Sequence, residues 1–317
     1  MATMPTPQLV LGTMYFGTRL DDAESFALLD RFVEAGGRWL DTADCYCFWE
    51  AESGHGGQSE AVIGRWLAAN PSMRSEVRIS TKIGAEPQFP GGFPEHVGGL
   101  SAQAIRDAFL GSRDRLGVDS VDLLWAHIED RSARLEETVE AMTDLVTAGA
   151  TQATGFSNHP TWIVERAQHL ARGLGRPAFT ALQHSYSYLQ PRPYAPIDGQ
   201  DHRFGMLTDE HRDYARSNGL DVWAYSPLLQ GRYDRDDRDF TSAYEHIGNE
   251  RRLAALRQVA DELGVSPGQV VLAWLVGSTP SITPMLGGST VEQLDAALVG
   301  VQLTLAQEQR GLLDAAS

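Results

Sequence analysis

The chain has few cysteines, no long apolar run and a shortage of cations. Only two cysteines occur among its 317 residues, Cys45 and Cys47. Because one residue separates them, a disulfide between them would be badly strained, so we expect reduced thiols and a cytoplasmic location. No window reaches the run of roughly 18 apolar residues that a membrane-spanning helix needs. The first residues also lack the basic and apolar regions of a signal peptide.

Acidic residues outnumber basic ones, with 42 Asp and Glu against 26 Lys and Arg and a net charge of −16. An acidic surface repels phosphate backbones and anionic lipids, so nucleic acids and membranes are poor partners. Hydrophobic residues make up 42% of the chain, which is enough for one large core. We therefore expect a single domain over residues 1–317.

Short apolar runs alternate with amphipathic segments along the whole sequence. The runs that predict strands are residues 9–13, 38–42, 77–82, 121–127, 153–156, 178–183, 221–225 and 282–286. The segments that predict helices are residues 22–35, 59–69, 101–116, 134–148, 161–172, 208–217, 249–263 and 291–298, with an extra helix from Ser266 to Gly277. This alternation predicts a single (β/α)8 TIM barrel. The alternative is a doubly wound open sheet, but its glycine-rich first turn is absent from Leu11-Gly12-Thr13-Met14.

Four stretches are longer than ordinary connections: residues 47–58, 84–99, 187–205 and 229–248. Each follows a predicted strand, so all four are expected as long loops at the carboxyl end of the barrel, where barrel enzymes keep their sites. Ser59 and Glu60 predict the start of the second helix, with the serine as a side-chain cap.

Four side chains that carry chemistry stand at or just after predicted strand ends. Asp41, Lys82 and His127 end the second, third and fourth strands, and Tyr46 follows Asp41 by five residues. An ammonium beside a phenol should lower the tyrosine pKa, while a carboxylate keeps the lysine charged. Such a phenol is a tuned proton donor for a developing alkoxide, and His127 can donate a second hydrogen bond to orient the substrate.

Over nearly all its length the sequence resembles the aldo-keto reductases. The matching runs are Leu11 to Met14, Asp41 to Tyr46, Ser80 to Lys82, Asp122 to His127, Gly155 to Asn158 and Ala224 to Leu228. The resemblance implies NAD(P)H-dependent reduction of an aldehyde or ketone, or the reverse oxidation, without a metal. It assigns Tyr46 as general acid/base, Lys82 and Asp41 as its tuning pair, and His127 as the residue that orients the substrate.

The same resemblance implies where the cofactor lies. Beside Asp41, the first loop would contribute Gly12, Thr13 and Met14. Ser157, Asn158 and Gln183 would bind the nicotinamide carboxamide, and Tyr225 would stack on its ring. The pyrophosphate path would be lined by Ser226, Pro227, Leu228, Gln230 and Gly231. The adenosine phosphate would be clamped by Gly287, Gly288, Ser289 and Gln293.

The chain departs from the family pattern at this clamp. Where many members carry a lysine or arginine for the 2′-phosphate, this chain offers the neutral Ser289, Thr290 and Gln293. Ala296 and Ala297 replace a common Glu-Asn pair. The resemblance to the family implies NADPH as the cofactor, and the sequence leaves the use of NADH open.

Aromatic residues stand next to the expected site. Phe48 and Trp49 follow Tyr46, and the first loop adds Tyr15 and Phe16. An aromatic wall at the substrate mouth would suit a bulky or ring-bearing carbonyl compound. The alternative is that Phe48 and Trp49 only pin the long loop to the barrel.

The sequence offers three alternatives to a metal-free reductase. A zinc site from Cys45, Cys47 and His55 is a poor match to zinc-ligand spacing, so no metal is expected. A barrel hydrolase needs more strand-end acids and histidines than Asp41 and His127. A nicotinamide-binding regulatory subunit, resembling the β subunits of potassium channels, would keep the cofactor pocket with little turnover. The sequence leaves the substrate, the direction of flux and the oligomeric state open.

Overall fold

The computed structural model describes residues 8–197, 202–235 and 237–316, and its centre is a closed barrel of parallel strands. Each strand pairs with the next one along the chain, and the last pairs with the first. The strands are β1 (Val10–Gly12), β2 (Trp39–Asp41), β3 (Arg78–Ile83), β4 (Val121–Ala126), β5 (Thr151–Ser157), β6 (Ala181–Ser185), β7 (Asp221–Tyr225) and β8 (Ile282–Leu286). The (β/α)8 barrel predicted from the sequence is confirmed.

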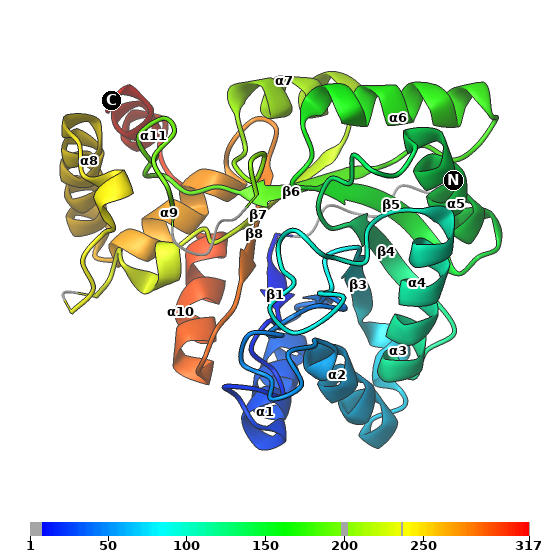
Figure 1. Ribbon diagram of the computed structural model, residues 1–317. Helices are drawn as coiled ribbons and strands as arrows, with labels where there is room; N and C mark the ends of the chain where they lie inside the picture. Colours follow the sequence, from blue (N-terminus) through cyan, green and yellow to red (C-terminus); the bar gives the residue numbers. More distant parts are fainter. Residues whose placement is uncertain (1–7, 198–201, 236, 317) are drawn as a thin grey trace.

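Helices connect the strands and surround the barrel (Figure 1). They are α1 (Asp22–Glu34), α2 (Gln58–Ala69), α3 (Met73–Glu76), α4 (Ala102–Leu116), α5 (Leu135–Thr147), α6 (Thr161–Gly173), α7 (Asp209–Asn218), α8 (Ile247–Leu263), α9 (Pro267–Val276), α10 (Val291–Gln302) and α11 (Gln307–Ala315). The short α3 and the last helix α11 were not predicted. None of the helices in the described part of the chain combines the length and apolar character that crossing a bilayer requires.

The strand register brings the predicted site residues to one level of the barrel. Gly12 pairs with Asp41, and Asp41 pairs with Ser80. On the opposite side, Ser157 pairs with Gln183. Since neighbouring parallel strands run in the same direction, these paired residues all lie toward the carboxyl end.

Tryptophans pack against one another in the barrel interior. Trp223 packs edge-on against Trp39, with ring centroids 5.1 Å apart, and against Trp125, with centroids 5.2 Å apart. Gly155 leaves the space that the Trp125 ring needs, because a Cβ there would lie 2.5 Å from that ring. The interior at these rings is therefore a packed core, as in other barrels of this type.

The start of α2 differs from the sequence prediction. The helix begins at Gln58 after Gly57, so Ser59 is not its cap. Ser59 is fully buried instead, and its hydroxyl donates to the Thr13 carbonyl (2.8 Å) and lies 2.8 Å from the Thr42 hydroxyl. Ser59 thereby ties α2 to the ends of β1 and β2, which positions the loop that carries Tyr46.

Candidate active site

Asp41, Tyr46 and Lys82 form one connected group at the carboxyl end of β2 and β3. The Lys82 ammonium is in direct contact with both an Asp41 carboxylate oxygen and the Tyr46 hydroxyl. It also donates to the Thr42 carbonyl at 2.9 Å. The Tyr46 hydroxyl lies 3.2 Å from Asp41 Oδ2. Three of the four side chains predicted to act together are therefore within hydrogen-bond distance of one another.

Lys82 is the only lysine in the 317 residues, and the other residues in the Lys and Arg count are all arginines. Its side chain is 1% exposed and faces the fully buried Asp41. A lysine pKa responds to burial, and its single ammonium fits beside a hydroxyl, whereas a guanidinium is larger and stays charged. The single lysine of the chain thus stands where its ammonium, whose pKa can shift, contacts the Tyr46 hydroxyl.

Asp41 is fixed by further donors from β3 and β6. Ser80 Oγ donates to Asp41 Oδ1 at 2.5 Å, and Gln183 Nε2 donates to the same oxygen at 3.3 Å. A buried carboxylate is tolerated only when it is paired and hydrogen-bonded, and both conditions hold here.

Burial sets the protonation of the Tyr46 hydroxyl. Removal from water raises the pKa of Tyr46 well above its ordinary value, and the neighbouring Asp41 carboxylate raises it further. Burial also lowers the pKa of Lys82, which the Asp41 carboxylate opposes. The sequence-based expectation of a lowered tyrosine pKa is wrong for this state, because it counted the ammonium and left out desolvation. The phenol is thus protonated at neutral pH, as a proton donor must be.

His127 follows β4 directly and faces the Tyr46 ring. The two ring centroids are 6.1 Å apart in an edge-on arrangement. Burial lowers the pKa of His127 well below its ordinary value, with the Lys82 charge as a second cause, so the imidazole is neutral at pH 7. Its Nδ1 lies 3.4 Å from Cys45 Sγ, and its backbone carbonyl accepts from Asn158 Nδ2 at 3.0 Å.

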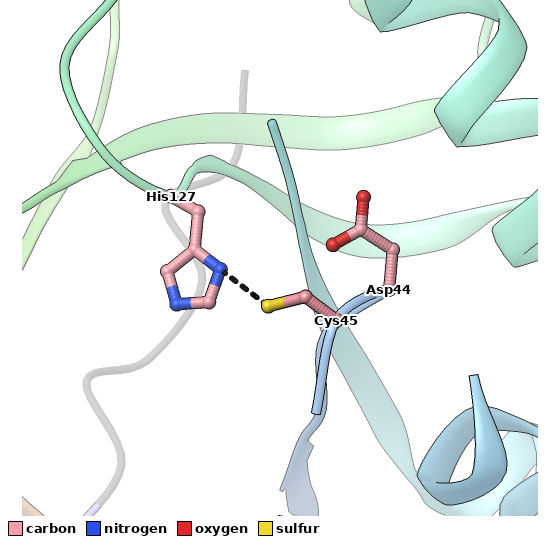
Figure 2. Close-up of side chains that lie close together, drawn as sticks. All are labelled: Asp44, Cys45 and His127. Carbon is pink, nitrogen blue, oxygen red and sulfur yellow. Dashed lines mark hydrogen bonds between the residues drawn. The ribbon is translucent and has the colours of Figure 1, made fainter. Parts of the chain in front are cut away.

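Figure 2 shows His127 with Cys45 and Asp44, whose ligand-type atoms all lie within 4.8 Å of one another. The zinc set considered from the sequence is not this group. The Cys47 side chain hydrogen-bonds Thr18, and His55 Nδ1 lies 3.0 Å from Glu86. The residue pattern alone does not reveal that Cys45 turns toward His127.

The four residues expected around a nicotinamide meet at the ends of β5, β6 and β7. Asn158 Nδ2 donates to Ser157 Oγ at 3.1 Å, and the Tyr225 hydroxyl donates to Asn158 Oδ1 at 2.8 Å. Gln183, in register with Ser157, reaches Asp41 as described above. These groups therefore adjoin the Asp41–Lys82–Tyr46 group.

Beyond β7 the chain turns sharply through residues expected to line the pyrophosphate path. Ser226, Gln230 and Gly231 have positive φ angles of 55°, 61° and 81°. Pro227 is buried, and its carbonyl accepts from Ser187 Oγ at 2.6 Å; Leu228 is half-buried. Ser226 and Gln230 are exposed in this turn at the rim of the barrel.

The expected clamp after β8 is the start of α10. Gln293 accepts from the Ser289 backbone N–H at 2.9 Å, and the Thr290 hydroxyl accepts from the Gln293 N–H at 3.3 Å. Gly287 and Ser289 are exposed, and Gly288 is half-buried. The segment therefore presents neutral polar groups at a helix N-terminus.

Gly12 and Thr13, in the first loop, are buried and pack against neighbouring strands. The Thr13 hydroxyl donates to the Asp41 carbonyl at 2.9 Å, and a Cβ on Gly12 would lie 3.1 Å from Met285. Met14 is half-buried. Gly12 and Thr13 thus hold β1 against β2 and β8, which fixes the position of Asp41.

Phe48 and Trp49 pack edge-on at the barrel mouth, with centroids 5.1 Å apart, and Trp49 is 50% exposed. The other two expected mouth residues differ from each other. Tyr15 is half-buried beneath the Arg19 guanidinium, 4.4 Å from its ring. Phe16 is 1% exposed in the hydrophobic core, so its ring is a core residue and does not line the mouth.

Known proteins match the chain over almost its whole length. The family model of the aldo/keto reductase family matches residues 8–317. The chain belongs to this family. It is 29% identical to norsolorinic acid reductase stcV of Emericella nidulans, over 98% of this chain and 78% of that protein. It is 29% identical to oxidoreductase YrpG of Bacillus subtilis, over 95% and 89%. It is 30% identical to an aryl-alcohol dehydrogenase of Pestalotiopsis microspora, over 90% and 70%. Like these relatives, this aldo/keto reductase is an oxidoreductase.

Sequence reasoning missed two aromatic residues of this aldo/keto reductase near the mouth. Phe93 packs against Phe48 with centroids 5.1 Å apart, and against His202 with centroids 5.9 Å apart. Both stand in stretches that were predicted as long loops at the carboxyl end. Because no periodic pattern governs such loops, only loop length pointed to them.

Proposed function

We propose that this chain moves a hydride between a nicotinamide cofactor and the carbonyl carbon of an aldehyde or ketone, or catalyses the reverse oxidation. The observation that carries the proposal is the direct contact between the Lys82 ammonium and the Tyr46 hydroxyl. A protonated, half-buried phenol held by a cation at the barrel mouth is a positioned general acid. The family membership and the names of the relatives support the same reaction class.

The side chains at the ends of β5, β6 and β7 fit a nicotinamide. Ser157, Asn158 and Gln183 offer hydroxyl and amide groups that both donate and accept, which is what a carboxamide requires. Tyr225 offers a ring face beside Asn158. The N-terminus of α10, a helix of 12 residues, suits the phosphate end of the cofactor. When bound, the reduced nicotinamide supplies the hydride.

The proton comes from Tyr46. On substrate binding, the phenol O–H turns from Asp41 Oδ2 to the carbonyl oxygen and transfers its proton as that oxygen gains negative charge. The Lys82 ammonium then stabilises the phenolate that remains, and Asp41 keeps the ammonium charged and oriented. Neutral His127 donates a hydrogen bond from Nε2 to the same oxygen.

The mouth favours a ring-bearing substrate. Phe48, Trp49 and Phe93 form a run of packed rings, and Phe48 packs against the same small apolar cluster as Tyr46. Flat aromatic compounds stack on such surfaces. One relative is named an aryl-alcohol dehydrogenase. We therefore propose aryl aldehydes, aryl ketones or the matching alcohols as the substrate class.

Fluorescence titration of the purified protein with NADPH and NADH tests the proposal, followed by a panel of aryl and aliphatic carbonyls monitored at the reduced-nicotinamide absorbance. Tight binding with turnover supports it. Binding without turnover of any compound would favour the regulatory-subunit alternative instead, and absence of binding would refute the nicotinamide site. Loss of turnover on treatment with a chelator would contradict a metal-free reaction.

We propose NADPH as the preferred cofactor, with NADH also accepted. Ser289→Arg should strengthen NADPH binding about tenfold and leave NADH binding nearly unchanged, because a guanidinium adds charge-assisted hydrogen bonds to the 2′-phosphate. The measurement is the ratio of the two dissociation constants. Ser217→Arg, which adds the same charge at an exposed position on α7, is the control. An unchanged ratio in Ser289→Arg would mean that the adenosine phosphate lies elsewhere.

A further inference from the structure

Cys45 is a buried thiol that the proposed reaction does not use. Its side chain is 4% exposed, and its Sγ lies 3.4 Å from His127 Nδ1, within hydrogen-bond distance for sulfur. Figure 2 shows the other ring nitrogen, Nε2, on the side of the ring away from Cys45. The two ring nitrogens of His127 therefore have different environments, with the sulfur of Cys45 near Nδ1 and not near Nε2.

A neutral imidazole carries one N–H, and the partner of one nitrogen determines which nitrogen holds it. We propose that Cys45 is a positioning residue: its S–H donates to His127 Nδ1 and so holds the imidazole in the tautomer whose Nε2–H faces the substrate oxygen. The proposal rests on the proposed function, in which Nε2 must be a donor. With the other tautomer, Nε2 would be an acceptor and would repel the carbonyl oxygen.

Both partners are in the protonation state that this direction of the hydrogen bond requires. Burial raises the pKa of the Cys45 thiol well above its ordinary value, and the nearby Asp44 and Glu86 carboxylates raise it further, so the S–H is present at neutral pH. The imidazole is neutral for the reasons given above. An imidazole nitrogen is a good acceptor, whereas a thiol sulfur is a weak one. In the proposed arrangement the S–H donates and Nδ1 accepts across the 3.4 Å contact.

The backbone of His127 is held independently of the ring. Asn158 Nδ2 donates to its carbonyl at 3.0 Å, and its own N–H donates to the Ile83 carbonyl at 3.0 Å. Loss of the thiol would thus release the ring and its tautomer without moving the chain.

Asp44 points to a competing explanation for the cluster, because its buried Oδ1 has no hydrogen-bond partner in the described residues. With Cys45 and His127 it offers oxygen, sulfur and nitrogen ligands, so a bound zinc ion is the competing explanation.

Cys45→Ala tests the positioning role, with Cys45→Ser as the conservative variant. Removing one hydrogen bond of this kind should lower kcat about fivefold, while the dissociation constant of the cofactor stays within about twofold. Serine keeps an O–H donor and should restore kcat to within about twofold of the wild type. Cys47→Ala is the matched control: this second buried thiol hydrogen-bonds Thr18 rather than His127, and kcat should not change.

The decisive readout is the tautomer itself, observed by NMR on protein labelled with ¹⁵N-histidine. The His127 signals are assigned by their absence from the spectrum of His127→Gln. We expect a protonated Nε2 and a bare Nδ1 in the wild type and in Cys45→Ser, and a mixture of tautomers in Cys45→Ala. This readout needs no turnover, so an inactive protein with the expected tautomers would refute the proposed function and leave the role of the thiol intact.

Three results would overturn the inference. One is a bare Nε2 in the wild-type protein. Another is a Cys45→Ala variant with the wild-type kcat and the wild-type tautomer. The third is a stoichiometric zinc ion in the purified protein whose removal by a chelator changes the His127 signals, because the thiolate and Nδ1 would then be metal ligands.

Discussion

Tyr46→Phe should lower kcat for carbonyl reduction by about 10²- to 10⁴-fold, the range that a general acid typically contributes. The substitution removes one atom, the hydroxyl oxygen that contacts Lys82 and lies 3.2 Å from Asp41. The ring remains and can still pack edge-on against His127. Without the phenol, the developing alkoxide must take its proton from water. The dissociation constant of the nicotinamide cofactor should stay within about twofold, because the hydroxyl contributes the proton and not binding energy.

Two further measurements make this result specific. Tyr214→Phe removes a hydroxyl that donates to Glu165 at the surface, at 2.9 Å, and should leave kcat unchanged. Because Lys82 is the only lysine, protein labelled with ¹⁵N-lysine gives a single side-chain signal for this residue. In Tyr46→Phe that signal should shift, since the ammonium loses one of its partners, yet remain a single sharp signal. Full activity in Tyr46→Phe would rule out this tyrosine as the acid.

Residues at strand ends could be predicted from the sequence, because a parallel barrel brings every strand end to the same edge. Asp41, Lys82 and His127 were found in this way, and the barrel register does bring Asp41 and Lys82 into contact. Tyr46 lies in the loop after β2, so its position also depends on that loop turning back over the barrel. For Asp41, Lys82 and His127, strand order determines the neighbours.

Features that depend on loop conformation or on burial could not be predicted in this way. Cys45 faces His127, and Phe93 reaches Phe48, only because of how two irregular loops fold. Phe16 sits next to a half-buried tyrosine in sequence, yet its own ring turns into the core. The pKa of Tyr46 depends on how much water the folded chain removes, which charge pairing in the sequence does not reveal.

Lys82→Met should have the largest effect on stability of any single change in the site. Lys82 and Asp41 are 1% and 0% exposed, so the substitution leaves a buried carboxylate without its cation. Breaking a buried pair from one side costs about 3–5 kcal/mol. Ser80 and Gln183 still donate to Asp41, but neutral donors do not replace a charge. The measurement is the free energy of unfolding in urea, together with kcat, which should fall at least as far as in Tyr46→Phe.

The double variant Lys82→Met/Asp41→Asn separates the stability role of this pair from its chemical role. Replacing the carboxylate by a neutral amide removes the unpaired charge, so the double variant should regain at least half of the lost stability and none of the activity. The control is Arg216→Met, which breaks an exposed pair with Asp213 and should cost less than about 1 kcal/mol. If the double variant is no more stable than Lys82→Met, the loss comes from packing rather than from the buried charge. If Lys82→Met keeps wild-type kcat, the contact between the ammonium and the phenol has no role in proton transfer.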